Sequence, residues 1–405
     1  MINSADTVWV IVATALVMIM TPTLAFFYGG LVRKKNVLSI LMQCLVILAV
    51  ISIQWVLFGY SLAFGPDKGG VIGGYEWFFL KNVGLQPLEG QTIPHQLFVC
   101  FQMMFAVITP ALMVGAFAER INFPGFLFFI ILWSTFIYDP MAHWVWAPGG
   151  WLFDKGVLDF AGGTVIHITA GISALVMSLM IGKRNGGASS PSPHNLPFAV
   201  LGAGFLWFGW FGFNAGSALA VKEQTVSAFI NTNTAASAAV LMWMALDWLI
   251  HKTPTVLGVI TGAVAGLVAI TPAAGFVTPI ASIVIGAGGS ILGFIFVTYV
   301  KKKCGYDDTL DVFGVHGMAG IWGAIATGLF ASKNIGGTDG LFYGNPSQLI
   351  VQALSVVVAI IFSAAGTFIL YKICDFLIGM RVESRDEKIG LDLTQHHEAG
   401  YTLID

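Results

Sequence analysis

Two histidines occur in the same short phrase, which the chain contains twice. Asp159 precedes His167 by eight positions and Asp308 precedes His316 by eight positions. After two intervening residues each histidine is followed by Ala-Gly-Ile, inside an apolar run of helical length. Eight helical residues rise about 12 Å. If these runs cross a membrane, whose hydrocarbon layer is about 30 Å thick, both imidazoles lie near its middle.

Two imidazoles at the same depth could face each other and line a passage. One ring nitrogen would donate a hydrogen bond and the other accept it, so the pair stays neutral and offers its outer nitrogens to a small polar guest. Such a pair favours neutral, hydrogen-bonding species over ions. Either histidine alone is explained equally well by a structural role, and the symmetric pair is what favours function. We expect the pair to bind neither a metal ion nor a haem. No Cys, Asp or Glu stands at the depth of the two histidines, and the passage between them suits haem poorly.

The composition defines the kind of protein that must position these histidines. The 405 residues are 57% hydrophobic and 10% charged, with a mean hydropathy of +0.82. This predicts an all-α polytopic membrane protein, and the 48 glycines favour close helix packing. A net charge of -2 without a basic stripe argues against a nucleic-acid partner, and four scattered cysteines predict no disulfide framework.

Eleven apolar runs have the length of transmembrane helices. When the loops are assigned alternately to two sides, fourteen of the 19 lysines and arginines fall on one side. By the positive-inside tendency, this predicts a multi-pass protein of the cell membrane with its N-terminus outside and its C-terminus in the cytoplasm. The predicted spans are 8-30, 38-64, 95-118, 122-140, 164-181, 198-219, 226-250, 255-272, 278-300, 313-331 and 347-378.

The two histidine phrases lie in spans that run in opposite directions. Repeated elements with opposite insertion predict an inverted five-plus-five repeat, with half-repeats at about 8-181 and 198-331 and the functional site at its centre. A weaker repeat, Ile-Thr-Pro-Ala, ends at Ala111 and at Ala273, again five spans apart. The eleventh helix, 347-378, is long enough to be strongly tilted. The transmembrane domain is therefore 1-378, and residues 379-405 form a cytoplasmic tail.

Aromatic residues gather toward the outer ends of several spans. Phe101 and Phe105 share one helix face, and the stretch Trp207–Ser217 ends the sixth span. Packing or an interfacial aromatic belt explains most single members of such stripes. Their concentration, together with Trp146, predicts a cation-π vestibule with Ser217 as a hydrogen-bond acceptor. Asp159 is expected mainly to cap its helix and also to bias the outer mouth toward cations.

These residues together resemble the ammonium transporter (Amt/Rh) family. The matching motifs extend over nearly the whole chain. They are Asp159-Phe-Ala-Gly-Gly-Thr with Gly182-Lys-Arg184, Asp311-Val-Phe-Gly-Val-His316-Gly, Gly209-Trp-Phe-Gly-Phe-Asn-Ala-Gly-Ser217, Phe26-Phe-Tyr-Gly-Gly30 and Gly390-Leu-Asp392. The resemblance implies eleven helices, a homotrimer in the lipid bilayer and one pore per subunit.

The resemblance also implies roles for particular side chains. The recruitment site would contain Trp146, Ser217 and Phe105, supported from behind by Asp159. The gate and the pore would consist of Phe105 with Phe213, then His167 and His316, with Trp210 and Thr271 along the path. The tail resembles a segment through which relatives contact neighbouring subunits and PII-type regulators. It reads His396-His-Glu-Ala-Gly-Tyr401 where the family pattern is His-Gly-Glu followed by Ala-Tyr.

The resulting hypothesis is a transporter of ammonium, ammonia and methylammonium, not an enzyme, with no cofactor. Ammonium would be recruited outside and lose a proton, because a bare cation at the bilayer centre is costly. Ammonia would pass the histidines, and the proton would either return outside or follow through them. The alternative is an ammonium sensor that uses the same pore fold and signals through its tail. Uptake by liposomes without any partner would distinguish the two.

Overall fold

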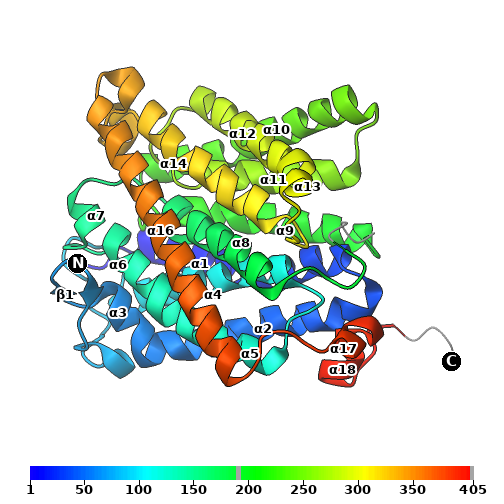
Figure 1. The fold of residues 1–405 in the computed structure, drawn as a ribbon. Coiled ribbons are helices and arrows are strands. Elements are labelled where there is room, and N and C mark those ends of the chain that lie inside the picture. Colours follow the sequence, from blue (N-terminus) through cyan, green and yellow to red (C-terminus); the bar gives the residue numbers. More distant parts are fainter. Residues whose placement is uncertain (188–192, 402–405) are drawn as a thin grey trace.

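The protein is a bundle of long helices (Figure 1). The computed structural model describes residues 1–187 and 193–401. In this part of the chain ten helical runs are long and apolar enough to cross a membrane, and the 15-residue helix α11 is a shorter apolar helix. Together they match the eleven predicted spans.

The spanning elements, some of which include a π-helical segment (η2, η4, η5, η6 and η7), have the following bounds. They are α1 (Ser4–Leu31), α2 (Val37–Gln54) with η2 (Trp55–Gly59) and α3 (Tyr60–Phe64), α4 (His95–Phe117), α5 (Phe123–Trp133) with η4 (Ser134–Tyr138) and α6 (Asp139–Trp146), η5 (Gly163–Ile168) with α8 (Thr169–Ile181), α9 (Leu196–Gly216), α10 (Glu223–His251), α11 (Val256–Ile270), α12 (Pro279–Ile295) with η6 (Phe296–Val300) and α13 (Lys301–Cys304), η7 (Phe313–Met318) with α14 (Ala319–Phe330), and α16 (Pro346–Leu377).

Short elements occupy the loops between the spans. They are η1 (Lys34–Asn36), the antiparallel strands β1 (Asp67–Lys68) and β2 (Ile72–Gly73), η3 (Phe78–Leu80), α7 (Trp151–Asp154), α15 (Lys333–Gly336), η8 (Leu341–Tyr343), α17 (Ser384–Ile389) and α18 (Leu391–His396). Most predicted span ends are correct to within three residues. The fourth span instead continues to Trp146, and the ninth continues to Cys304. Both extensions add Trp or Lys, which suit a helix end at the polar interface.

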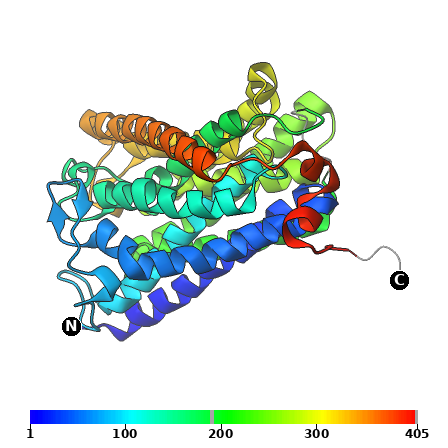
Figure 2. The same cartoon turned by 60° about the horizontal axis from the view of Figure 1, so that its bottom comes forward.

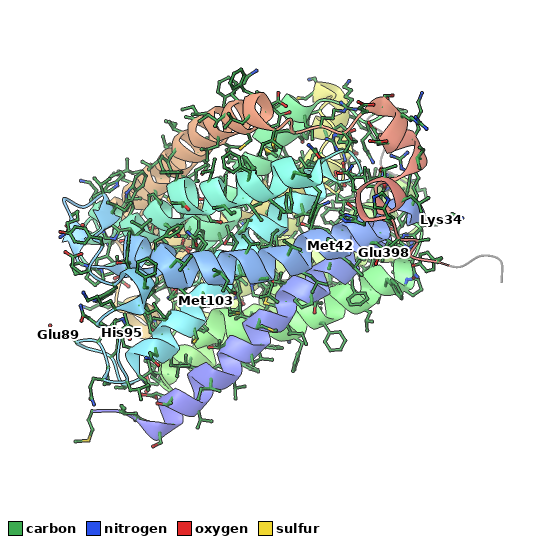
Figure 3. All side chains as sticks on the ribbon, turned by 90° about the horizontal axis from the view of Figure 1, so that it is seen from below. Lys34, Met42, Glu89, His95, Met103 and Glu398 are labelled. Atoms are coloured by element: carbon green, nitrogen blue, oxygen red, sulfur yellow. The ribbon has the colours of Figure 1, made fainter. Side chains whose placement is uncertain are left out.

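The N-terminus and the helices α17 and α18 lie at opposite ends of the bundle, and the end that holds the N-terminus is called the outer end (Figures 1 and 2). This arrangement agrees with an odd number of crossings. Glu89 and His95 lie near the same end as the N-terminus, whereas Lys34 and Glu398 lie at the other end (Figure 3). The 32-residue helix α16 runs obliquely across the bundle (Figure 1). At about 1.5 Å per residue it is longer than a bilayer core is thick, so it crosses at a tilt.

Reciprocal contacts relate the two half-molecules. Gly171, four residues after the first histidine, packs so closely on the backbone of Gly317 that a Cβ would lie 2.2 Å from its nitrogen. Gly320, four residues after the second histidine, packs on the backbone of Ile168, where a Cβ would lie 3.3 Å from the nitrogen. Exchanging the halves exchanges these two contacts, as a two-fold axis requires. The inverted repeat is therefore centred on the histidine segments.

An aspartate precedes each histidine segment and binds its first backbone N–H groups. The Asp159 carboxylate accepts four hydrogen bonds, of 2.6–3.0 Å, from the N–H groups of residues 162–165. Asp308 accepts one, of 2.7 Å, from the N–H of Phe313. Asp311 also stands just before η7, but its carboxylate accepts a 2.6 Å hydrogen bond from Lys301 Nζ. The lysine run therefore attracts this carboxylate away from the helix end.

The tail packs against the segment that joins α1 and α2. The N–H of Leu391 donates to Asn36 Oδ1 at 2.8 Å, and the N–H of Ser39 donates to Asp392 Oδ1 at 2.8 Å. Figure 2 shows α17 and α18 beside the end of α2. Residues 402–405 of the predicted tail lie outside the described residues.

Candidate functional site

The two histidines meet in the centre of the bundle. The Nδ1 atoms of His167 and His316 are 3.3 Å apart, and the ring centroids are 5.3 Å apart with an interplanar angle of 21°. Only 1% and 3% of the two residues are exposed. One Nδ1 therefore donates to the other, as predicted. The Nε2 of His167 is buried without a hydrogen-bond partner in the described part of the chain, so it is free to bind a small molecule.

Both histidines lie in π-helical segments, η5 and η7, each six residues long. A π-helical turn holds more residues than an α-helical turn, so it rotates the side chains that follow it relative to a regular helix. The same irregularity at the same place in both halves turns each imidazole toward the other.

Aromatic side chains cover His167 from the outer side. Trp210 stacks on its ring with centroids 5.5 Å apart, and Phe213 lies at 6.1 Å. Trp210 Nε1 donates a 2.9 Å hydrogen bond to Thr271 Oγ1, which fixes the indole plane. Thr271 therefore contacts the back of Trp210 and does not line the small cavity beside the histidines. That cavity has a volume of about 10 Å³ and is lined by both histidines, Trp210, Phe213 and apolar side chains.

Two phenylalanines close the outer side of this cavity. The ring centroids of Phe105 and Phe213 are 4.5 Å apart, with an interplanar angle of 37°. Phe101 packs edge-on against Phe105 at 4.9 Å. Both gate residues are almost completely buried. The rings leave no open channel, so a molecule can pass only if they move.

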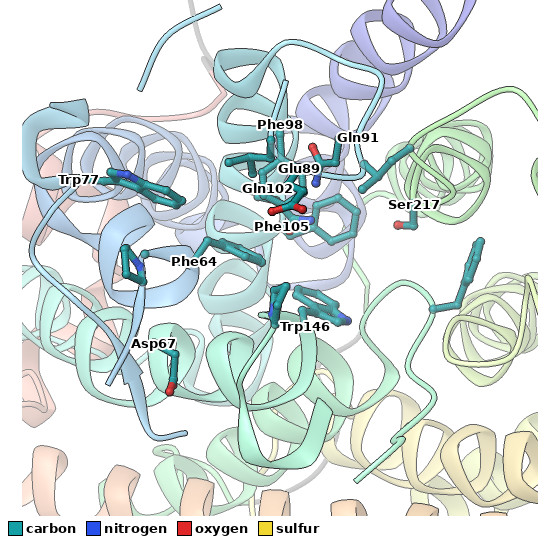
Figure 4. Close-up of a pocket in the computed structure, with 16 residues that line it drawn as sticks. Phe64, Asp67, Trp77, Glu89, Gln91, Phe98, Gln102, Phe105, Trp146 and Ser217 are labelled. Carbon is teal, nitrogen blue, oxygen red and sulfur yellow. The ribbon is translucent and has the colours of Figure 1, made fainter. Parts of the chain in front are cut away.

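An outer cavity of about 430 Å³ lies above the phenylalanines (Figure 4). Phe105, Trp146 and Ser217 line it, as predicted. Trp146 packs edge-on against Phe105 with centroids 6.0 Å apart. The hydroxyl of Ser217 donates to the carbonyl of Phe213 at 2.9 Å, which leaves its lone pairs available to a donor in the cavity.

Asp159 lies behind this cavity and does not line it. Its carbonyl oxygen accepts a 2.9 Å hydrogen bond from Trp146 Nε1. Burial raises the pKa of its carboxyl, and the four N–H groups that it binds oppose that shift. The structure thus joins Asp159 to both Trp146 and the first histidine segment.

A second cavity, of about 260 Å³, opens on the opposite side of the histidines. His316 lines it, together with Tyr28, Asp247, His251 and Asp311. Since His316 also lines the small central cavity, the two spaces meet at this imidazole. The outer cavity, the two rings, the histidine pair and the inner cavity therefore follow one another across the bundle.

Several residues of this arrangement were not predicted from the sequence. The loop between α3 and α4 forms a wall of the outer cavity with Asp67, Trp77, Glu89 and Gln91, and α4 adds Gln102. The loop is polar and glycine-rich, so its sequence gives no sign of which cavity it covers. Asp67 accepts a 2.8 Å hydrogen bond from His143 Nε2, which lowers the pKa of its carboxyl.

No metal centre occurs in residues 1–187 and 193–401: no three His, Cys, Asp or Glu side chains there are close enough to hold an ion. The histidine pair has no third ligand. The arrangement suits a small polar molecule that can both give and receive hydrogen bonds.

Comparisons with known proteins identify the family. The model of the Ammonium Transporter Family matches residues 8–401. The chain is 52% identical to the ammonium transporter of Bacillus subtilis over 399 residues, covering 98% of each chain. The structure of Mep2 from Candida albicans superimposes with a TM-score of 0.92 at 35% identity, covering 99% of this chain and 94% of that one. A solved sensor Amt protein matches with a TM-score of 0.89 at 32% identity, covering 97% and 98%. On this evidence the chain belongs to the ammonium transporter family.

Proposed function

We propose that this protein carries ammonium across the cell membrane by removing a proton from it and moving ammonia past the histidine pair. The observation that carries the proposal is the buried, mutually hydrogen-bonded pair of His167 and His316, which lies between two cavities on opposite sides of the bundle. Family membership over residues 8–401 supports the same substrate. Methylammonium, which is slightly larger, is the expected analogue.

Recruitment takes place in the outer cavity. A cation that enters loses part of its hydration, and the faces of Trp146 and Phe105 compensate through cation-π attraction. Ser217 Oγ accepts an N–H from the substrate. A potassium ion has no N–H to donate, so it gains nothing from the directional part of this contact.

Deprotonation precedes passage between Phe105 and Phe213. A charged ion behind these rings would be buried among apolar side chains at a cost of several kcal/mol, whereas neutral ammonia can pass at a much lower cost. Beneath the rings, the unpaired Nε2 of His167 is the first available partner for ammonia. The released proton either returns to the outer side or moves through the two imidazoles.

Current recording on solid-supported membranes tests the proposal. Purified protein in liposomes should give a current on an ammonium step and none on a potassium step. In the His167→Ala/His316→Ala double variant, the current and methylammonium uptake should change or disappear. If neither the uptake nor its discrimination against potassium changes in that variant, the role of the histidine pair is wrong.

A sensor that signals through its tail is the second candidate. A likeness to a sensor Amt protein, with a TM-score of 0.89, is compatible with it, but the identity to the Bacillus subtilis ammonium transporter is higher. Ammonium-driven current in liposomes that contain no partner protein supports transport. Binding of ammonium without any current or methylammonium uptake would support the sensor.

The proposal extends to the placement of the chain in the cell membrane. We propose an outer N-terminus and a cytoplasmic C-terminus, supported by the bias of lysine and arginine toward one side. Residues 1-378 then form the transmembrane domain and 379-405 the cytoplasmic tail. Protease cleavage of the tail in inside-out but not right-side-out vesicles would test this orientation.

We also propose a homotrimer with one pore per subunit, and a PII-type regulatory protein as a partner of the tail. Both rest on the family resemblance. Hydrogen bonds of the tail with the segment between α1 and α2, such as that from Lys35 Nζ to the carbonyl of Glu387 at 3.0 Å, give the tail a fixed surface. Native mass spectrometry, with and without a purified PII-type protein, would test both.

A further inference from the structure

Three polar side chains in the outer cavity take no part in the pathway described above. Glu89 and Gln91 come from the loop between α3 and α4, and Gln102 comes from α4. In Figure 4 their side chains gather above the ring of Phe105, with Ser217 and Trp146 on other sides of the cavity. A molecule that enters from outside therefore meets these groups on its way to the phenylalanines.

The loop presents Glu89 and Gln91 through a tight turn. The N–H of Gln91 donates to the carbonyl of Leu88 at 3.0 Å, and Gly90 has a φ of 75°. A positive φ at the third position is what a type II turn requires, and glycine adopts it without strain. This geometry holds Glu89 and Gln91 on the two sides of one glycine.

Asp6 fixes this loop to the rest of the outer end. Its Oδ2 accepts a 2.5 Å hydrogen bond from Thr92 Oγ1, and its Oδ1 accepts a 2.7 Å hydrogen bond from the N–H of Val221. Thr92 follows Gln91, and Val221 follows the end of the helix that carries Ser217. One carboxylate thus ties the Glu89–Gln91 turn to the segment that carries the predicted recruiting hydroxyl.

All three side chains have acceptors without partners. The Oε1 atoms of Gln91 and Gln102 are buried and accept no hydrogen bond from any residue of the ranges 1–187 and 193–401. Within the same ranges Glu89 forms no ion pair, whereas the loop acids Asp67 and Glu76 pair with His143 and Lys68. Buried acceptors normally have a partner, so unpaired oxygens in one cavity point to a donor that is bound there.

We propose that Glu89, Gln91 and Gln102 form an entry subsite that binds an ammonium cation before it reaches Trp146 and Ser217. The inference rests on the proposed function and adds a second binding position to the same cavity. Ammonium is a small cation with four N–H donors and no acceptor, which matches one carboxylate and two amide oxygens. Three oxygens are too few to replace the hydration shell of potassium, which needs a ring of carbonyls.

The test measures the ammonium concentration that gives half-maximal current for the full-length chain in liposomes at 0.15 M salt. Glu89→Gln should raise this concentration about threefold to tenfold, the loss expected for one charge at short range in a hydrated cavity. Gln91→Leu combined with Gln102→Leu should raise it about fivefold, because two hydrogen bonds are lost. The maximal current should stay the same, since the gate and the histidines are untouched.

Two substitutions on the same loop serve as matched controls. Glu76→Gln removes one negative charge, and Gln86→Leu removes one exposed amide, but neither residue lines the cavity. Both should leave the half-maximal concentration within twofold of wild type. If Gln102→Leu does not purify as a well-behaved protein, Gln91→Leu alone, at a loop position, still tests the amide contribution.

The outcomes separate this inference from the proposed function. Absence of both an ammonium current and methylammonium uptake in the wild type overturns the proposed function. A normal wild-type current, with Glu89→Gln and Gln91→Leu both matching their controls, overturns the entry subsite only. Competition by potassium that disappears in Glu89→Gln would also overturn it, because the site would then not recognise ammonium.

Discussion

The two halves of the repeat carry the same histidine phrase but surround it differently. His167 lies under Trp210 and Phe213, and its Nε2 faces a central cavity of about 10 Å³. His316 opens directly into an inner cavity of about 260 Å³. The repeat therefore determines where the imidazoles meet, and the unequal aromatic cover determines which side is closed. A nearly symmetric scaffold therefore encloses the histidine pair more tightly on one side than on the other.

The aspartates before the two histidines also differ, in the number of backbone N–H groups that each one binds. Asp159 binds four N–H groups, whereas Asp308 binds one, and its Oδ1 is buried without a partner in the described part of the chain. On the outer side the carboxylate is fully used to hold the segment. On the inner side the Asp308 carboxylate accepts one hydrogen bond, so the free-energy cost of burying its charge is less well compensated.

Exchanging each carboxyl for an amide should therefore have unequal effects on the stability of the protein. Asp159→Asn leaves one oxygen for four N–H donors, so we expect a loss of about 4 kcal/mol in stability. Asp308→Asn keeps the acceptor for Phe313 and removes a buried charge, so at pH 7.5 we expect no loss. Thermal unfolding in detergent measures both, with Asp154→Asn, an exposed acid on the outer side, as control. Equal losses at the two sites would contradict the comparison.

The pH dependence of stability should reveal the titration of the Asp308 carboxyl. Burial raises the pKa of this carboxyl to about 6, with Lys301 opposing the shift. Since an unfolded aspartate has a pKa near 4, the folded state holds the proton more tightly between the two values. The contribution of Asp308 to stability is therefore full below about pH 4 and is lost as the pH rises through 6, by about 3 kcal/mol.

Unfolding of wild type and Asp308→Asn from pH 4 to 7.5 measures this contribution as a difference. The variant should gain relative to wild type as the pH rises, and the gain should level off above pH 7. A constant difference over this range would mean that Asp308 does not titrate there.

Much of this arrangement could be predicted from the sequence, because hydropathy and charge bias operate over whole spans. Eight of the eleven predicted spans agree with the structure at both ends to within three residues, and the repeated Asp-to-His phrase pointed to the contact between His167 and His316. The π-helical form of η5 and η7 could not be predicted, because six residues carry no periodicity that distinguishes it from an α-helix. The outer wall with Glu89 and Gln91 was missed because loop contacts depend on the folded position of distant helices.

The two histidines should differ when each is replaced alone. His167→Ala removes the first hydrogen-bonding group behind the gate and leaves Trp210 over a void, so we expect methylammonium uptake to fall about tenfold. His316→Ala affects an imidazole that already meets the inner cavity, so its effect should be smaller. Uptake by liposomes, normalised to the amount of incorporated protein, measures both. If His316→Ala has the larger effect, the inner half controls passage and the comparison is reversed.

The smallest effect should come from the contact that orients the aromatic cover. Trp210→Phe keeps an aromatic face over His167 but removes the 2.9 Å hydrogen bond to Thr271. A lost neutral hydrogen bond costs about 0.5–1.5 kcal/mol, and the lower half of this range corresponds to a fall of about twofold to fivefold in uptake. Thr271→Val removes the same bond from the other side and should have a similar effect, while Trp248→Phe, at an exposed position, should have none. If the double variant loses no more than either single variant, the two residues act through this one bond; additive losses would show that Trp210 and Thr271 affect uptake independently.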